Sequence, residues 1–435
     1  MVDAVTVKKL GPGKALRDEV SVPGDKSISH RALIMGAMAQ GSTRIEGLSL
    51  AEDVGATWQC LRELGVNIVS RCRMTTVSGR GWRGLAQPKK TLEAGNSGTT
   101  ARLLMGLIAA NPVAATISGD ASLNRRPMGR VAQPLRRMGA IIDMAPGDLA
   151  PVEVRGAALA GIDHVSPIPS AQVKSAVLIA GVQALGDTSV SEPALSRDHT
   201  ERMLPVFGIP VRRQGLEAAI KGGLRMSPAL MTVPGDLSCA AFWIVAAALA
   251  PGSLVRLPGV GTNPTRAGFL EVLKRMGAQF SAQAADLGPD AGYEPAADIE
   301  ARSSALTATD IQPAEVPALI DEVPILALAA CLAKGVSRFR GLGELRHKES
   351  NRLEGLAGLL RALGAKAEAS GDDLVIEGVS RLTGARVSAG GDHRLAMTAM
   401  IAGLVAEGET VVEDASTAAA SYPGFTEDLR KLGGL

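Results

Sequence analysis

The chain has 435 residues, of which 46% are hydrophobic, 21% are charged and only 3% are aromatic, and its formal net charge is +2. This composition predicts a globular protein of two or three domains, and the dispersed Lys and Arg residues argue against a nucleic-acid partner. The four cysteines form no C-x-x-C pair and the five histidines lack metal-ligand spacing, so we expect no disulfide framework and no bound metal. The N-terminus has no apolar signal core and the longest apolar run, 239–250, is too short to span a membrane, which predicts a soluble cytoplasmic protein.

One structural unit recurs six times along the chain. Each copy begins with an apolar helix, continues through a β-branched strand and ends with an amphipathic helix that stops at a glycine. The copies run from Gly24 to Gly65, Gly95 to Gly139, Ser170 to Gly208, Gly235 to Gly277, Asp321 to Gly364 and Gly391 to Gly433. The first helix of most copies is also expected to end at a glycine. Six such units predict an α/β protein, although the architecture alone indicates no chemistry.

Polar and charged residues stand at the starts of these otherwise apolar helices. In chain order they are Lys26, Ser27 and Arg31 in "GDKSISHR", Arg102 after "GNSGTT", Gln172 and Lys174 after Ser170, Lys348 and Arg352 opening the helix of "RHKESNRL", and Asp392 and Arg394 in "GGDHRL". Because the helix macrodipole is already positive at an N-terminus, cations there are unfavourable unless an anion binds. Any one of these charges alone is typical of a solvated surface. Together they predict an anion site assembled from several helix ends.

Two loops and one further helix start add candidates. Arg126 lies in "NRRPMGR" and Arg197 in "SRDHTERML", both in segments that lead into a helix, and Asp321 precedes the buried helix of "LIDEVPILALAACLA". A carboxylate beside cations ionises readily and can accept a proton from a substrate hydroxyl. The alternative for Asp321 is a plain helix N-cap.

Eight motifs, in order over nearly the whole chain, resemble those of the 5-enolpyruvylshikimate-3-phosphate (EPSP) synthase family. They are "GDKSISHRAL", "GNSGTTARLL", "NRRPMGR", "PSAQVKSAVLIAG", "SRDHTERML", "LIDEVPILA", "LRHKESNRL" and "GGDHRLAM". The resemblance implies a two-domain inside-out α/β barrel with three repeated units per domain. The expected domains are residues 23–232 and residues 1–22 plus 233–435, with the active site in the cleft between them.

The resemblance also implies a reaction. The enolpyruvyl group of phosphoenolpyruvate would pass to the 5-hydroxyl of shikimate 3-phosphate with release of phosphate, in the shikimate pathway of aromatic amino-acid biosynthesis. The expected partners are these two small molecules, with no cofactor, no metal, no nucleic acid and no membrane, and the expected state is a monomer. Glyphosate is expected to inhibit competitively with phosphoenolpyruvate.

The site residues implied by the resemblance fall into three groups. Shikimate 3-phosphate would be held by Lys26, Ser27, Arg31, Ser170, Ala171, Gln172, Arg197, Asp321 and Lys348. Phosphoenolpyruvate would be held by Lys26, Gly98, Arg126, Gln172, Arg352 and Arg394. The catalytic groups would be Asp321 as the base on the hydroxyl, with Glu349 or Lys26 supplying the proton to the enol carbon. Ala171 and Ala420 depart from the Ser and Lys that some members carry at these positions.

Three other functions stay open at this point. The UDP-N-acetylglucosamine enolpyruvyl transferase family shares the fold but usually carries a Cys in the loop that here reads "GDASLNRRPMGR". A nucleic-acid end-processing protein of related repeat architecture would need a broader basic surface. A non-catalytic anion-binding scaffold would bind phosphate without turnover.

Overall fold

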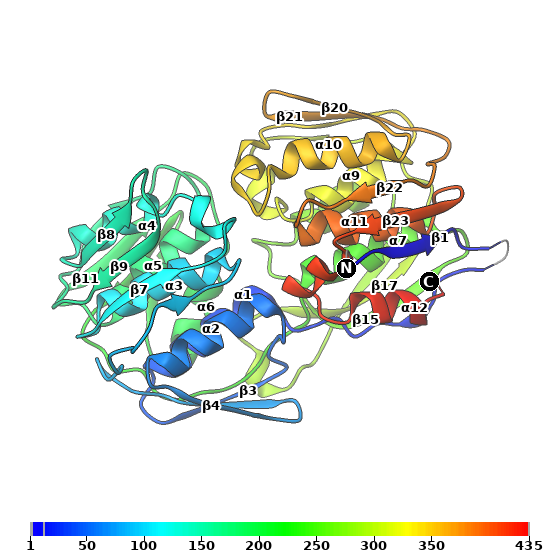
Figure 1. The fold of residues 1–435 in the computed structure, drawn as a ribbon. Coiled ribbons are helices and arrows are strands. Elements are labelled where there is room, and N and C mark those ends of the chain that lie inside the picture. Colours follow the sequence, from blue (N-terminus) through cyan, green and yellow to red (C-terminus); the bar gives the residue numbers. More distant parts are fainter. Residues whose placement is uncertain (1–2, 12–13, 434–435) are drawn as a thin grey trace. The chain divides into compact units, whose positions relative to one another are not determined.

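The computed structural model describes residues 3–11 and 14–433 and divides them into two compact units, which Figure 1 draws. The first unit consists of Gly24–Pro234 and Leu287–Glu294. The second unit consists of the described residues up to Pro23, Gly235–Asp286 and the chain from Pro295 onward. Each unit has its own hydrophobic core.

Residues 287–294 are a part of the first unit that the sequence did not predict. Within this segment the Tyr293 ring packs on the core of the first unit and its hydroxyl donates to the Thr232 carbonyl at 3.0 Å. The next residue, Glu294, is buried against His199 with Oε1 2.6 Å from Nδ1. These contacts tie the segment to the first unit, although the chain on either side of it belongs to the second unit.

The first unit contains three repeats. The first has α1 (Lys26–Met38), β3 (Ser42–Glu46), α2 (Glu52–Glu63), β4 (Asn67–Arg71) and β5 (Met74–Ser78). The second has β6 (Leu92–Glu93), α3 (Gly98–Ala109), β7 (Ala114–Ser118), α4 (Gly129–Arg137), β8 (Ile141–Ala145) and β9 (Leu149–Arg155). The third has β10 (Asp163–Val165), α5 (Ala171–Val182), β11 (Asp187–Ser191), α6 (His199–Met203), β12 (Val211–Gln214) and β13 (Glu217–Lys221), and β14 (Leu230–Thr232) follows.

The second unit repeats the pattern. Near the N-terminus it has β1 (Val5–Lys8) and β2 (Arg17–Glu19). Its first repeat has α7 (Leu237–Leu249), β15 (Leu254–Gly261), α8 (Gly268–Arg275), β16 (Gln279–Ala284) and β17 (Ala296–Arg302). Its second has β18 (Asp310–Ile311), α9 (Val323–Cys331), β19 (Val336–Phe339), α10 (Arg352–Ala362), β20 (Lys366–Ser370) and β21 (Asp373–Glu377). Its third has β22 (Arg386–Ser388), α11 (His393–Gly403), β23 (Glu409–Glu413) and α12 (Phe425–Lys431).

The strands form six small sheets, one for each repeat. In the second repeat, for example, helix α3 connects β6 to β7, and these two strands pair in parallel. Strand β9 pairs antiparallel with both β7 and β8. In two sheets the parallel edge strand comes from a distant part of the chain, because β14 pairs with β3 and β2 pairs with β15. The described residues before Pro23 therefore lie in the second unit, and β14 completes the sheet of the first repeat just before the chain leaves the first unit at Pro234.

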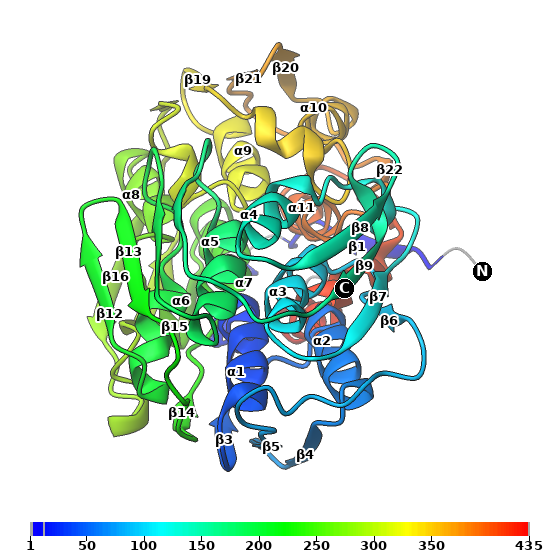
Figure 2. The ribbon, with the colours of Figure 1, turned by 90° about the vertical axis from the view of Figure 1, so that its left-hand side faces the viewer.

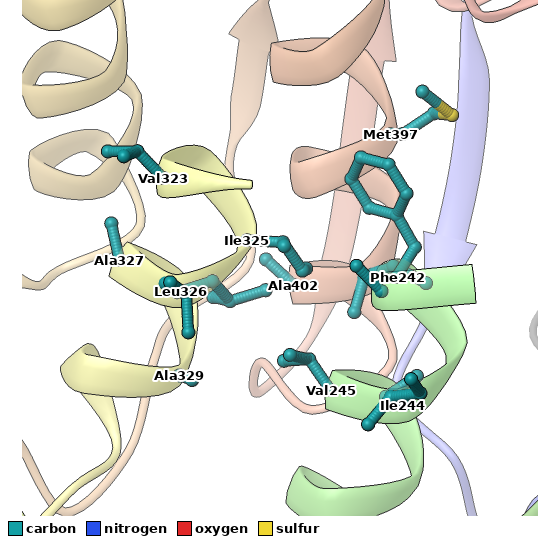
Figure 3. Packing of buried hydrophobic residues seen from close by; sticks show 14 of the residues in the cluster. Phe242, Ile244, Val245, Val323, Ile325, Leu326, Ala327, Ala329, Met397 and Ala402 are labelled. Atoms are coloured by element: carbon teal, nitrogen blue, oxygen red, sulfur yellow. The ribbon is translucent and has the colours of Figure 1, made fainter. Parts of the chain in front are cut away.

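The first helix of each repeat lies inside its unit. Helices α1, α3 and α5 form the interior of the first unit, and strands lie toward its margins in Figure 2. In the second unit, Figure 3 shows Phe242 of α7, Ile325 of α9 and Ala402 of α11 meeting in one core. These helices are apolar nearly all round, which is the pattern of a buried helix and confirms this part of the sequence prediction.

Glycine ends the second helix of every repeat. The final glycines of the six repeats all have positive φ, between 81° and 110°, a backbone conformation that costs other residues energy. The first helices differ from the prediction, because neither their C-caps nor the residues that follow the C-caps are glycines. The C-caps are Ala39, Ala110, Gln183, Ala250, Leu332 and Leu404. Within residues 3–11 and 14–433, no helix combines the length and apolar character that a membrane span requires.

Candidate active site

The N-terminal ends of α1, α3 and α5 meet in the first unit. Side chains near these ends join the helices in pairs: Arg31 of α1 donates from Nη2 to Ser175 Oγ of α5 at 2.6 Å, and Gln172 Nε2 of α5 donates to Thr99 Oγ1 of α3 at 2.9 Å. Each bond joins residues within the first two turns of its helices. We call the residues gathered here the first-unit cluster: Lys26, Ser27, Arg31, Gly98, Arg102, Arg126, Ser170, Ala171, Gln172 and Arg197.

Arg31 is a buried cation among neutral acceptors. Its guanidinium donates to Thr200 Oγ1 at 2.8 Å, to the Ser27 carbonyl at 2.8 Å and to Ser175 Oγ at 2.6 Å. Burial, with a smaller contribution from the charge of Arg197, lowers the pKa of Arg31 to about 10. A bound anion would offset this cost by supplying the missing negative charge.

Lys26 begins α1 and pairs with a carboxylate of the next helix. Its ammonium lies 2.8 Å from Asp53 Oδ2 of α2, and both side chains are largely buried. The N-cap of α1 is Asp25, whose side chain accepts from the Ile28 N–H. The acidic N-cap and Asp53 together explain how a lysine is accommodated where the helix dipole disfavours it.

Gly98 is the first residue of α3 and lies beside two arginines. A Cβ at this position would lie 3.2 Å from Arg102 Nη1 and 3.3 Å from Arg126 Nη1. Arg102 also donates to Gln172 Oε1 at 2.6 Å. Arg126, which is 7% exposed, donates to the Asn96 carbonyl at 3.1 Å and to Asn96 Oδ1. The two guanidinium groups and the helix end therefore offer several N–H donors to one anion.

Ser170 is the N-cap of α5, and its hydroxyl accepts from the Val173 N–H. Ala171 is the first residue of that helix, and Gln172 is the second. Arg197 precedes α6 and is close enough to Arg31 for their charges to interact. The structure thus brings the predicted residues of the first unit together at the ends of three neighbouring helices.

The second unit has a cluster of alternating charge, which we call the second-unit cluster: Asp321, Lys348, Glu349, Arg352, Asp392 and Arg394. Asp321 lies within reach of three cations, at 3.4 Å from Lys348 Nζ, 3.7 Å from Arg352 Nη1 and 3.9 Å from Arg394 Nη2. The N-cap position of α9 is Glu322, which makes no capping bond. Asp321 is therefore a charge partner of these cations and is not a plain helix cap.

Arg352 is the buried centre of the second-unit cluster. Its Nε donates to Asp392 Oδ2 at 2.8 Å, and its Nη2 donates to Asp392 Oδ1 at 3.2 Å and to Glu349. Burial acts to lower the pKa of Arg352, but the carboxylates of Asp392, Glu349 and Asp321 outweigh it and raise the pKa above its usual value. Arg352 therefore stays charged.

The position of Lys348 before α10 corrects one prediction. We expected Lys348 and Arg352 to open the same helix, but α10 begins at Arg352 and Lys348 is extended after a short 3-10 helix, Gly343–His347. Asn351 caps α10 and fixes where it starts, since its side chain accepts from the Glu354 N–H. Lys348 still reaches Asp321 across the cluster.

Sequence reasoning missed the partners that orient the cations. We did not predict that Asp53 pairs with Lys26, that Thr200 accepts a hydrogen bond from Arg31, or that Asp392 pairs with Arg352. Only Asp392 had a signal in the sequence, because it stands at a helix start next to Arg394. The other partners lie on elements that only the fold brings together.

A sequence model described as EPSP synthase (3-phosphoshikimate 1-carboxyvinyltransferase) matches residues 10–429. A curated 3-phosphoshikimate 1-carboxyvinyltransferase from Bacillus thuringiensis subsp. konkukian (strain 97-27) is 46% identical over 418 residues, covering 96% of this chain and 97% of that protein. A second, from Bacillus cereus (strain B4264), is 45% identical over the same length. A solved EPSP synthase from Acinetobacter baumannii matches with a TM-score of 0.86 and 40% identity, covering 99% of this chain and 98% of that chain.

Proposed function

Because the chain belongs to the EPSP synthase family, we propose that it transfers the enolpyruvyl group of phosphoenolpyruvate to the 5-hydroxyl of shikimate 3-phosphate. Both substrates carry a phosphate and a carboxylate, which suits the cations of both clusters. The observation that supports this function best is Asp321, a carboxylate held among Lys348, Arg352 and Arg394.

The reaction is an addition followed by an elimination. The 5-hydroxyl oxygen bonds to C2 of phosphoenolpyruvate while its proton passes to Asp321 and C3 gains a proton from Glu349 or Lys26. The tetrahedral intermediate then loses phosphate from C2 and a proton from C3, which restores the double bond. The cations stabilise the phosphate that leaves, and Asp321 is placed to act as the general base.

We propose that both clusters act on one pair of substrates. In the first unit, Lys26 would contact both substrates, Gly98, Arg126 and Gln172 would bind phosphoenolpyruvate, and residues around α1, α5 and α6 would bind shikimate 3-phosphate. In the second unit, Arg352 and Arg394 would bind phosphoenolpyruvate and Lys348 would bind shikimate 3-phosphate. The cytoplasmic location, the monomeric state and the absence of a metal stay predictions from the sequence.

Phosphate release tests the proposal directly. We expect turnover with phosphoenolpyruvate and shikimate 3-phosphate in the presence of EDTA, and a loss of about 100-fold or more in kcat for Asp321→Ala and for Lys26→Ala. Asp310→Ala and Lys90→Ala, at exposed ion pairs of the second and first units, are the matched controls and should keep the wild-type rate. Turnover with UDP-N-acetylglucosamine in place of shikimate 3-phosphate, or none with either acceptor, would overturn the function.

A further inference from the structure

The first unit buries a charged triad that takes no part in the proposed chemistry. Lys174 of α5 lies with its ammonium 2.7 Å from Glu192 Oε2 and 2.8 Å from Glu201 Oε1. The three side chains are between 1% and 3% exposed. Burial acts to lower the pKa of Lys174, but the two carboxylates outweigh it and raise the pKa, so the lysine is charged. We call these residues the buried triad.

Glu192 connects the buried triad to the start of α5. Its Oε1 accepts the backbone N–H of Ser170 at 2.7 Å, and Ser170 is the N-cap that precedes Ala171 and Gln172. The lysine is one helical turn further along α5 and binds the other oxygen of the same carboxylate. The Lys174–Glu192 ion pair therefore fixes the orientation of the Ser170 N-cap relative to α5.

Glu192 also holds the segment that carries Arg197. Its Oε2 accepts the hydroxyl of Ser196 at 2.7 Å, and the Lys174 ammonium donates to the Ser196 carbonyl at 3.5 Å. Arg197 is the next residue. The Lys174–Glu192 ion pair therefore contacts two separate segments. Each segment carries a residue that we assign to shikimate 3-phosphate, Ser170 in one and Arg197 in the other.

Glu201 extends the buried triad toward Arg31. It follows Thr200, whose hydroxyl oxygen accepts from Arg31 Nε at 2.8 Å and interacts with Ser175 Oγ at 2.7 Å. The charge of Glu201 is also near enough to act on Arg31. The arms of the triad therefore lead to Ser170, Arg197 and Arg31, which we assign to shikimate 3-phosphate, whereas Arg126, which we assign to phosphoenolpyruvate, is held by Asn96 and Ser122.

We propose that Lys174 and Glu192 are positioning residues for shikimate 3-phosphate, which set the geometry of Ser170 and Arg197 without touching the substrate. This inference rests on the function proposed above. Besides Lys174, the Glu192 carboxylate binds Ser170, which we assign to shikimate 3-phosphate, and Ser196, which precedes Arg197. Removing one partner leaves an uncompensated buried charge, so the segments shift even where the fold survives.

Steady-state kinetics with each substrate varied separately tests the inference. We expect Lys174→Met and Glu192→Gln to raise the KM for shikimate 3-phosphate by about tenfold or more, with much smaller changes in the KM for phosphoenolpyruvate. Ser196→Ala, which removes one hydroxyl from Glu192, should give a weaker effect in the same direction. Lys90→Met removes an exposed lysine of the same unit and should leave both KM values unchanged.

A second variant separates effects on folding from effects on substrate binding. Lys174→Met leaves Glu192 and Glu201 facing each other, so Lys174→Met/Glu201→Gln removes the repulsion and should restore part of the lost melting temperature without restoring the KM for shikimate 3-phosphate. If the soluble variants bind both substrates as the wild type does, or weaken both equally, the inference is overturned while wild-type turnover keeps the proposed function. If the wild type itself does not turn over shikimate 3-phosphate, both are overturned.

Discussion

Arg352 donates from Nε to Asp392 Oδ2 over 2.8 Å, and both side chains are almost completely buried. Asp392 is also the N-cap of α11, where it accepts the backbone N–H groups of Arg394 and Leu395. Burial acts to raise the pKa of Asp392, but the charge and hydrogen bonds of Arg352, together with the charge of His393, outweigh it and the pKa is lowered. One carboxylate therefore orients both arginines of the second unit that we assign to phosphoenolpyruvate.

Asp392→Asn should weaken both the fold and phosphoenolpyruvate binding. Removing one partner of a buried ion pair costs about 3 kcal/mol of unfolding free energy, because Arg352 is left partly uncompensated. We expect the KM for phosphoenolpyruvate to rise by about tenfold, with a smaller change for shikimate 3-phosphate. Urea unfolding and steady-state kinetics measure the two effects. Asp310→Asn breaks an exposed ion pair in the same unit and should cost less than about 0.5 kcal/mol. Unchanged phosphoenolpyruvate kinetics in Asp392→Asn would contradict this role.

Gly98→Ala should make the enzyme less sensitive to glyphosate. The new methyl group would lie 3.2–3.3 Å from the guanidinium groups of Arg102 and Arg126, so at least one must move away from the helix end. We expect the inhibition constant of glyphosate, measured against phosphoenolpyruvate, to rise by about tenfold or more. Gly55→Ala is the matched control, because a Cβ at Gly55 in α2 has no neighbour within 4 Å and alanine suits a helix. Equal inhibition constants for Gly98→Ala and the wild type would refute the assignment.

The repeats and their glycines were predictable because they depend on local physics. Hydrophobic periodicity identifies the buried helix of each repeat, and an amphipathic helix that ends at a positive-φ glycine such as Gly65 has a clear sequence signal. The strand β14 had no such signal, since its three residues pair with β3 from the far end of the same unit. Residues 287–294 were also missed, because Tyr293 and Glu294 depend on partners in the first unit that sequence spacing does not indicate.

Site residues that stand at the start of a helix were predictable from the sequence. The residues that form ion pairs with them were not. Lys26 and Arg394 stand out because cations at helix starts break a local rule. Asp53 in the first turn of α2 looks like an ordinary acidic residue at a helix start, which is favourable by itself. Its pairing with Lys26 depends on how α1 packs against α2, and a single sequence does not contain that information.

Asp53→Asn should disturb both substrates together. The Asp53 carboxylate lies 2.8 Å from the Lys26 ammonium, and both side chains are largely buried, so the pair fixes where the lysine points. Because we assign Lys26 to both substrates, we expect both KM values to rise by about threefold to tenfold. The neighbouring exposed residue supplies the control, and Glu52→Gln should behave as the wild type. A change in only one KM value would mean that Lys26 serves one substrate alone.

Because of His30, the unfolding free energy of the first unit should fall as the pH is lowered into the mildly acidic range. The ring is fully buried, with Nδ1 2.7 Å from Thr57 Oγ1, and burial together with the charges of Lys26 and Arg31 lowers its pKa well below 6.5. The unfolded chain binds a proton at this histidine below about pH 6.5 whereas the folded chain does not, so folding stability falls as the pH is lowered. Between pH 7 and pH 5 this one group removes up to about 2 kcal/mol of unfolding free energy. In His30→Gln that part of the pH dependence should disappear, while in His347→Gln, at an exposed histidine, it should persist. Urea unfolding at the two pH values measures it, and an equal loss in His30→Gln and the wild type would show that another group is responsible.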